Sequence, residues 1–250
     1  MNQERILFYG DFVNKAPRNG CSDVWNAFMV KGASYSNFSD IPICPCTAST
    51  TPKQLISYDD AKALFYKENK SGNSSFTINA YMHFYIDDQK FDGKQSSIWL
   101  YPQKALDIIK HFEGIITPDF STYVDFPDPI KRYNTYRMRA FGTWIANSGI
   151  KVINNVRWGT SETWNYCFDG IPINSIVSIG TISGGPRKHI NRRRFETGLF
   201  KMVEVLKPHT ILIYGSANGK CFDLLKEKGI TIVSFQSKTA KVFEGRKHHE

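Results

Sequence analysis

The sequence predicts an α/β protein whose mainly parallel sheet is built from repeated strand–helix units. From residue 76 onward, short apolar or β-branched runs alternate with longer helical patterns, and glycine or proline stands at several of their ends. Strands that alternate with helices form right-handed crossover units and pair in parallel. The pattern fits an open doubly wound sheet or an incomplete barrel-like sheet, and two more strands from the N-terminal region would allow an eight-stranded barrel.

Residues 1–75 are predicted to form a loop-rich N-terminal region that packs on an α/β core of residues 76–250, so that the two make one domain. Asn, Ser and Pro interrupt this region repeatedly. An apolar run at residues 6–9 predicts a short strand, and a helical pattern covers residues 59–68. The polar residues 67–75 predict an exposed loop.

The first half of the core supplies two strands and two helices. An apolar and β-branched run predicts a strand at residues 77–86. A helical pattern at residues 103–112 leads into a short strand at 114–117. The next helix is predicted at 129–147, where Pro129 suits the first turn because its backbone is already close to helical.

The second half of the core continues this alternation. Gly149 suits the end of the preceding helix. A strand at residues 151–158 precedes a helical pattern at 161–168, and a strand at 175–182 precedes one at 191–206. In the last of these helices, apolar side chains share one face at helical spacing: Phe195, Leu199, Met202, Val203 and Leu206.

The alternation ends with a strand, a helix and a strand. The strand is predicted at residues 210–214, the helix at 220–228 and the last strand at 230–235. Gly229 stands between the last two and suits the C-terminus of the helix.

The composition favours a folded protein with an anionic partner. The 250 residues are 41% hydrophobic and 14% aromatic, which is ample for a buried core and excludes general disorder. A formal net charge of +9 favours nucleic acid, nucleotides or anionic surfaces as partners, although many ordinary enzymes are also basic.

Location is predicted from the cysteines and from the absence of long apolar stretches. The 5 cysteines are scattered, as in a reduced cytoplasmic protein, and Cys44-Pro45-Cys46 lacks a second pair at zinc spacing. Residues 1–11 lack the apolar core of a secretory signal, and no stretch approaches the ~18 apolar residues of a membrane span. We therefore expect a cytoplasmic protein that does not contact a membrane.

A basic cluster lies where a glycine turn leads from the strand at 175–182 into the next helix. Exposed N–H groups make a helix N-terminus partly positive, so each cation there costs roughly 0.3–1 kcal/mol. A bound phosphate offsets this cost. The turn lacks Walker A spacing, but the turn and cluster together predict phosphate binding by Gly184, Gly185, Arg187, Lys188, Arg192, Arg193 and Arg194.

Further binding residues follow the predicted strands, because parallel α/β folds bind ligands at the carboxyl ends of their strands. Arg157 needs an anionic partner, either a protein carboxylate or a ligand. Trp158 is either part of the core or a stacking surface for a base or sugar. Tyr214 and Ser216 begin a glycine-rich turn that is superficially similar to a phosphate loop.

Three carboxylates lie at the same predicted edge of the sheet. Asp119 and Asp125 follow one strand and Glu162 follows the next. The aspartates can instead cap turns or helices, and Glu162 can complement a helix dipole. As catalytic residues, Asp119 with Glu162 or Asp125 would act as general base or bind a divalent metal ion, and no other cofactor is indicated.

The helix at 129–147 interleaves basic and aromatic residues, as nucleic-acid-binding surfaces do. The preferred interpretation is a solvated charged face with the aromatic side chains packed inward. The basic residues are Lys131, Arg132, Arg137 and Arg139.

Between Gly114 and Ser216 the chain carries a recognisable series of motifs. They are Pro118-Asp119-Phe120-Ser121, Asp125-x-Pro127, Asn134-x-Tyr136-Arg137-x-Arg139, Val152-Ile153 with Trp158, Phe168-x-Gly170-Ile171-Pro172, Leu206-x-Pro208 and Tyr214-Gly215. In this combination the chain resembles the bacterial and phage family called domain of unknown function 4417. The resemblance implies a role in replication, transfer or phage–host conflict, but no particular activity. Asn154-Asn155 departs from the proline expected there.

Three functions stay open. The leading hypothesis is a phage or mobile-element protein that binds nucleic acid or a phosphate-rich nucleotide through the basic helix N-terminus. The second is a metal-assisted enzyme that acts on nucleotides or nucleic acid. The third is a non-catalytic phage protein that captures a host protein partner.

Overall fold

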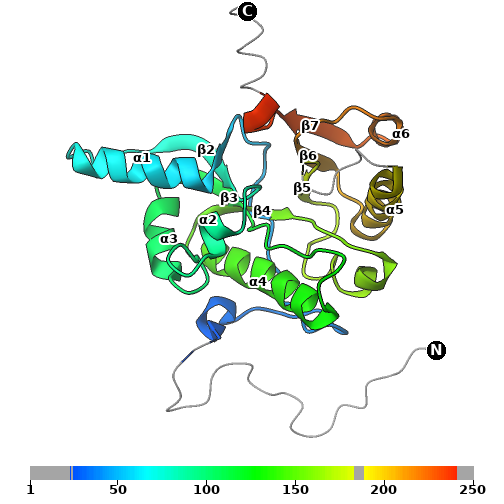
Figure 1. Ribbon diagram of the computed structural model, residues 1–250, viewed down its shortest axis with the longest axis horizontal. Coiled ribbons are helices and arrows are strands. Elements are labelled where there is room, and N and C mark those ends of the chain that lie inside the picture. The colour runs from blue at the N-terminus through cyan, green and yellow to red at the C-terminus, as the bar shows by residue number, and fades with distance from the viewer. Residues whose placement is uncertain (1–22, 24, 183–188, 241–250) are drawn as a thin grey trace, which may run out of the picture.

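The computed structural model describes residues 23, 25–182 and 189–240, and seven strands within them form one sheet (Figure 1). All the strands are parallel, and their order in the sheet is their order in the chain. The predicted α/β fold with a mainly parallel sheet is therefore confirmed. The strands are β1 (Leu55–Ser57), β2 (Ile78–His83), β3 (Phe112–Ile116), β4 (Lys151–Asn155), β5 (Ile176–Gly180), β6 (Thr210–Tyr214) and β7 (Thr231–Phe235).

The connections between strands contain most of the helices. None of the helices in the described residues combines the length and the apolar character that a bilayer crossing needs. The helices are α1 (Tyr58–Lys70), α2 (Gln89–Asp92), α3 (Pro102–Ile109), α4 (Asp128–Asn147), α5 (His189–Leu206) and α6 (Lys220–Glu227), with two 3-10 helices, η1 (Ala27–Val30) and η2 (Ser161–Asn165).

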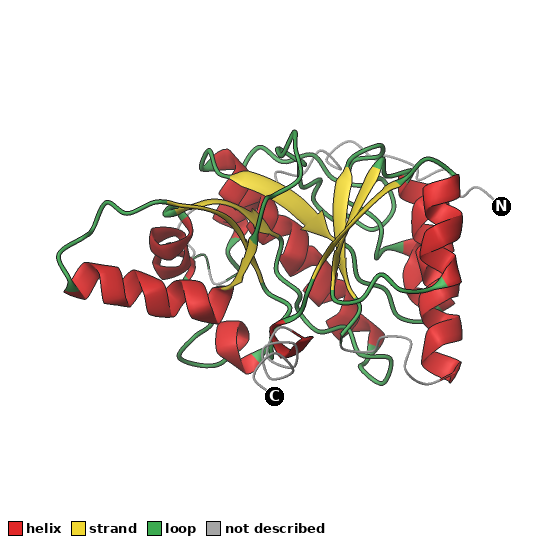
Figure 2. Ribbon diagram, turned by 90° about the horizontal axis from the view of Figure 1, so that it is seen from above, coloured by secondary structure: helices red, strands yellow, loops and turns green. Residues whose placement is uncertain are grey.

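The strand order decides between the two predicted architectures. In a doubly wound sheet the order reverses at a switch point, so that helices cover both faces. Here each strand crosses to its next neighbour, and right-handed crossovers of this kind keep the helices on one face. The sheet curls into a half-barrel with helices around its outside (Figure 2). The incomplete barrel is the correct alternative.

Side chains alternate between the outer and inner faces of this sheet. On the outside, one apolar cluster joins β2, β3 and β4 to α1, α3 and α4, and a second joins β5 and β6 to α5 and α6. On β4, for example, Val152 belongs to the first outer cluster and Ile153 to the inner one. The inner cluster contains Ala48, Tyr81, Ile116, Ile153, Ile176 and Leu212.

A segment from early in the chain fills a gap between β4 and β5. These strands pair only near the carboxyl end of β4, where Asn154 and Asn155 lie opposite β5. Before that point, the Thr47 N–H donates to the Val152 carbonyl at 3.0 Å. The amide nitrogen of Asn154 donates to the Cys44 carbonyl, also at 3.0 Å. The buried Asn154 thus ties the sheet to this inserted segment, residues 44–48.

Several elements differ from the sequence predictions. The helix predicted at 161–168 is only the 3-10 helix η2, and β1 and α2 were not predicted. Both β1 and α1 lie in the region expected to be loop-rich, yet they form the first strand–helix unit of the sheet. The strand predicted at residues 6–9 lies outside the described residues.

The solvated face predicted for the helix at 129–147 is wrong for three of its four basic residues. Lys131, Arg137 and Arg139 are buried, and Arg139 is completely inaccessible. The Arg139 guanidinium donates to the backbone carbonyls of residues 155, 167 and 169 at 3.1–3.2 Å. Arg137 forms an ion pair with Asp92 at 2.8 Å and lies 3.9 Å above the Phe120 ring. Arg137 and Arg139 therefore hold the fold together, and the three buried cations do not form an external binding surface.

Candidate functional site

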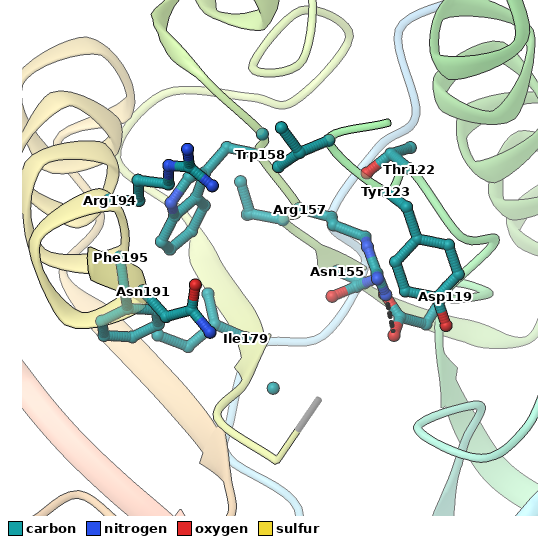
Figure 3. Close-up of a pocket in the computed structure, with 14 residues that line it drawn as sticks. Asp119, Thr122, Tyr123, Asn155, Arg157, Trp158, Ile179, Asn191, Arg194 and Phe195 are labelled. Atoms are coloured by element: carbon teal, nitrogen blue, oxygen red, sulfur yellow. Dashed lines mark hydrogen bonds and ion pairs between the residues drawn. The ribbon is translucent and has the colours of Figure 1, made fainter. Parts of the chain in front are cut away.

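A pocket lies at the carboxyl ends of β4 and β5, next to the first turns of α5 (Figure 3). Its volume is about 160 Å³. Residues from the loop after β3, from the end of β4 and from α5 line it together. Ligands of parallel α/β folds bind at this edge of the sheet, so the position agrees with the expected one.

A buried ion pair forms one side of the pocket. The Arg157 guanidinium donates to the Asp119 carboxylate at 2.7 Å, and the two side chains are only 17% and 11% exposed. The second carboxylate oxygen accepts a hydrogen bond from the Asn155 amide at 2.8 Å. Burial lowers the pKa of Arg157, but the charge and hydrogen bond of Asp119 outweigh it and the pKa is raised. Arg157 is therefore held as a cation by a protein carboxylate.

Hydrogen bonds extend this pair into the interior of the half-barrel. The Tyr85 hydroxyl donates to the Asn155 amide oxygen at 3.0 Å and is bonded to the Ser178 hydroxyl at 2.8 Å. Burial, followed by the negative charge of Asp119, raises the pKa of Tyr85 well above 10. Tyr85 thus stays protonated and fixes the orientation of the Asn155 amide.

A second carboxylate, that of Asp88, interacts electrostatically with both members of this ion pair, Asp119 and Arg157. Its two oxygens accept hydrogen bonds from the backbone N–H and the hydroxyl of Ser121 at 3.1 and 2.8 Å. Burial raises the pKa of Asp88 and nearby Asp119 adds to this effect, while the Ser121 bonds and Arg157 oppose it. Asp88 therefore holds the start of the loop that carries the pocket residues after β3.

The opposite side of the pocket is aromatic and rests on α5. The Trp158 and Phe195 rings lie 5.5 Å apart between centroids. The edge of the Trp158 indole sits directly over Gly198, where an added Cβ would overlap the ring. Only glycine lets the indole approach the helix this closely, and this contact fixes one wall of the pocket.

Three polar side chains face the pocket without a partner in the described part of the chain. Asn191 and the exposed Arg194 come from the first two turns of α5 and form no hydrogen bond or ion pair there. The third is Thr122, whose hydroxyl is buried. Figure 3 shows Thr122 across the pocket from Asn191 and Arg194.

Comparison with known proteins identifies the family. Residues 33–236 match the family described as "Domain of unknown function (DUF4417)". The chain belongs to this family. This match confirms the family that the sequence motifs indicated.

The chain is also similar to two mycobacteriophage proteins. It is 34% identical over 134 residues to the Gene 1 protein of Mycobacterium phage L5, covering 54% of this chain and 56% of the relative. It is 31% identical over 134 residues to the Gene 1 protein of Mycobacterium phage D29, covering 54% of this chain and 48% of the relative. The chain thus spans about half the length of these curated relatives. No solved structure matches it.

Four of the predicted site residues of this DUF4417 protein meet in the pocket: Asp119, Arg157, Trp158 and Arg194. The sequence left open whether the partner of Arg157 is a carboxylate or a ligand, and the carboxylate of Asp119 is the one observed. Arg193 lines a neighbouring hollow, and Arg192 is exposed on the helix but lines neither of these two pockets. Gly184, Gly185, Arg187 and Lys188 lie outside the described residues, so their phosphate-binding role stays a prediction.

The remaining predicted residues lie elsewhere. Glu162 and Asp125 are exposed and do not line the pocket with Asp119. Among the described residues, no three His, Cys, Asp or Glu side chains are close enough together to hold a metal ion. Tyr214 is buried and stacks on Tyr85 at 5.2 Å between ring centroids. Ser216 is exposed, and its hydroxyl accepts a hydrogen bond from the backbone of its own turn.

Sequence reasoning missed three polar residues of the pocket. Asn155 carried a signal, because an amide at the end of an apolar strand needs a partner inside the fold. Thr122 follows Asp119 by three positions in the same strand exit and could have been found from that position. Asn191 gave no signal of its own beside the more conspicuous arginines.

Proposed function

We propose that this DUF4417 protein binds a nucleotide or a nucleic-acid strand in the pocket between β4, β5 and α5. The observation that carries the proposal is that Asn191 and Arg194 line the same pocket as Trp158. The N-terminal turns of a helix attract phosphate through exposed N–H groups and the helix dipole. An indole stacks on nucleobases of any sequence. Phosphate and base are thus both accommodated.

The charges around the pocket support an anionic ligand. Asp119 neutralises Arg157, so that cation is already compensated. Arg194 is exposed and has no ion pair in the described residues, which leaves its full charge available for a phosphate. The net charge of +9 adds a general attraction for nucleic acid.

The metal-assisted enzyme has less support. Both oxygens of Asp119 are already occupied, one by Arg157 and the other by Asn155. Glu162 and Asp125, its predicted catalytic partners, do not line the pocket. Capture of a host protein is the remaining alternative, and the experiment below separates it from nucleic-acid binding.

Fluorescence anisotropy with labelled oligonucleotides across a salt series tests the proposal. We expect log affinity to fall linearly with log salt. Arg194→Ala should weaken binding about 5- to 10-fold and lower the salt slope by about 1. Arg193→Ala is the matched control. It removes the same charge from the neighbouring position of the helix, and the Arg193 side chain does not line this pocket.

Two results contradict the proposal. Equal losses in the two variants would mean that the helix attracts nucleic acid only through diffuse charge. No binding of oligonucleotides or free nucleotides at low salt would favour a protein partner instead.

A further inference from the structure

The hydroxyl of Thr122 is the least expected group in the pocket. Thr122 is 6% exposed, and its oxygen is buried without a hydrogen-bond partner in the described part of the chain. Adjacent hydroxyls differ: Ser121 binds Asp88 at 2.8 Å, and Thr163 binds the Thr160 carbonyl at 2.8 Å. Buried polar groups in folded proteins are almost always paired, so an unpaired one at a pocket wall indicates a partner supplied by a ligand.

The volume of the pocket limits what this partner can be. A space of about 160 Å³ is close to the cavity of roughly 150 Å³ that holds one benzene ring. One flat base therefore fits between the Trp158 wall and the side that carries Thr122. A base pair, or two stacked bases, would not.

We infer that the pocket takes one unstacked nucleobase and that the Thr122 hydroxyl, which neighbouring protein atoms cover in this structure, turns toward the base and forms a hydrogen bond with its edge. This inference rests on the proposed function and adds the form of the ligand, a single strand or its end. The base lies against Trp158, and its phosphate reaches Arg194 and Asn191 on the same α5 side of the pocket (Figure 3). A duplex keeps its bases stacked and paired, so it must first open to use this site.

Short labelled single strands, each made of one base, and the matching duplexes test the inference. Single strands should bind at least about 10-fold more tightly than duplexes. Thr122→Val keeps the shape of the side chain and removes the hydroxyl. It should weaken binding of the preferred base about 5- to 10-fold and reduce the difference between bases.

Thr122→Ser is the matched control, because it keeps the hydroxyl and should keep the base preference. Without ligand, Thr122→Val should melt at or above the temperature of the wild type, and Thr122→Ser, which loses a buried methyl group, should melt cooperatively a few degrees lower, which shows that both fold. The inference is overturned if Thr122→Val binds every strand like the wild type, or if duplexes bind as tightly as single strands. Either result leaves the effect of Arg194→Ala, and with it the proposed function, intact.

Discussion

Asp119→Asn tests whether a buried ion pair stabilises one side of the pocket. The two carboxylate oxygens accept from two different donors, Arg157 at 2.7 Å and Asn155 at 2.8 Å. An asparagine has the same shape but only one accepting oxygen. Whichever way its amide is turned, one donor then faces another donor. The substitution therefore removes a negative charge and also breaks one hydrogen bond.

The burial of the pair sets the size of the effect. Removing one partner of a buried ion pair costs about 3–5 kcal/mol, and a hydrogen bond to a charged group contributes about 1.5–3 kcal/mol. Side-chain exposures of 17% for Arg157 and 11% for Asp119 put the pair near the buried limit. Asp88 also attracts Arg157 and stays in place, which reduces the loss. We expect a fall of about 2–4 kcal/mol in the free energy of unfolding.

Urea unfolding at pH 7, followed by circular dichroism, measures this loss. Asp107→Asn is the control, because Asp107 pairs with Lys110 at 3.1 Å with both side chains about half exposed. Surface pairs of this kind contribute between about 0 and 1 kcal/mol. If the two substitutions lower the free energy of unfolding equally, the Asp119–Arg157 pair is solvated, and the conclusion that a buried ion pair forms this side of the pocket is refuted.

Two further predictions concern the surroundings of the pocket. Burial raises the pKa of the Asp88 carboxyl above its ordinary value of 3.8, so the folded state binds the carboxyl proton more tightly than the unfolded state. The free energy of unfolding therefore falls as the pH rises from the unfolded-state pKa through the folded-state pKa. Asp88→Asn should therefore gain stability relative to the wild type between about pH 4 and neutrality, and a constant difference in urea unfolding across that range would contradict this. Gly198→Ala should push the Trp158 indole away from α5, costing about 1–2 kcal/mol and weakening oligonucleotide binding, although glycine to alanine normally stabilises a helix. Thr197→Ala, on the exposed neighbour, is its control, and a stabilised Gly198→Ala that still binds normally would show that the indole is not held there.

Local patterns were sufficient for most helices and strands. In α5, four apolar residues predicted to share a face are buried, namely Phe195, Leu199, Met202 and Leu206. A period of 3.6 residues specifies one face of a helix without reference to the rest of the chain. The same holds for the buried runs of β5 and β6, which a parallel sheet covers on both faces.

The strand order could not be read from the sequence, because it depends on pairings between distant segments. β1 was missed for a different reason. It has three residues, and Ser57 at its end already caps α1 by accepting from the backbone N–H of Asp60. A run this short shows no alternation, so pattern alone does not separate it from a loop.

The residues that line the candidate pocket were predicted in part. Arg157 and Trp158 were found because an arginine and an indole at a strand exit each need a partner. Arg137 and Arg139 were misjudged because a charged residue on a helix is usually solvated, whereas most of their partners come from outside α4. Those partners are the carboxylate of Asp92 at the end of α2 and three backbone carbonyls that are distant in the sequence. Nothing in the sequence around the arginines indicates them.

The inserted segment at residues 44–48 has a consequence for biosynthesis. Thr47 bonds to Val152 and Cys46 to Ile176, partners that lie 105 and 130 positions later in the chain. At a translation rate of about 5–20 residues per second, these partners emerge roughly 5–25 s after the segment itself. Throughout that interval the nascent chain carries a segment whose place in the sheet does not yet exist. The sheet can therefore close between β4 and β5 only after both of these strands have been synthesised.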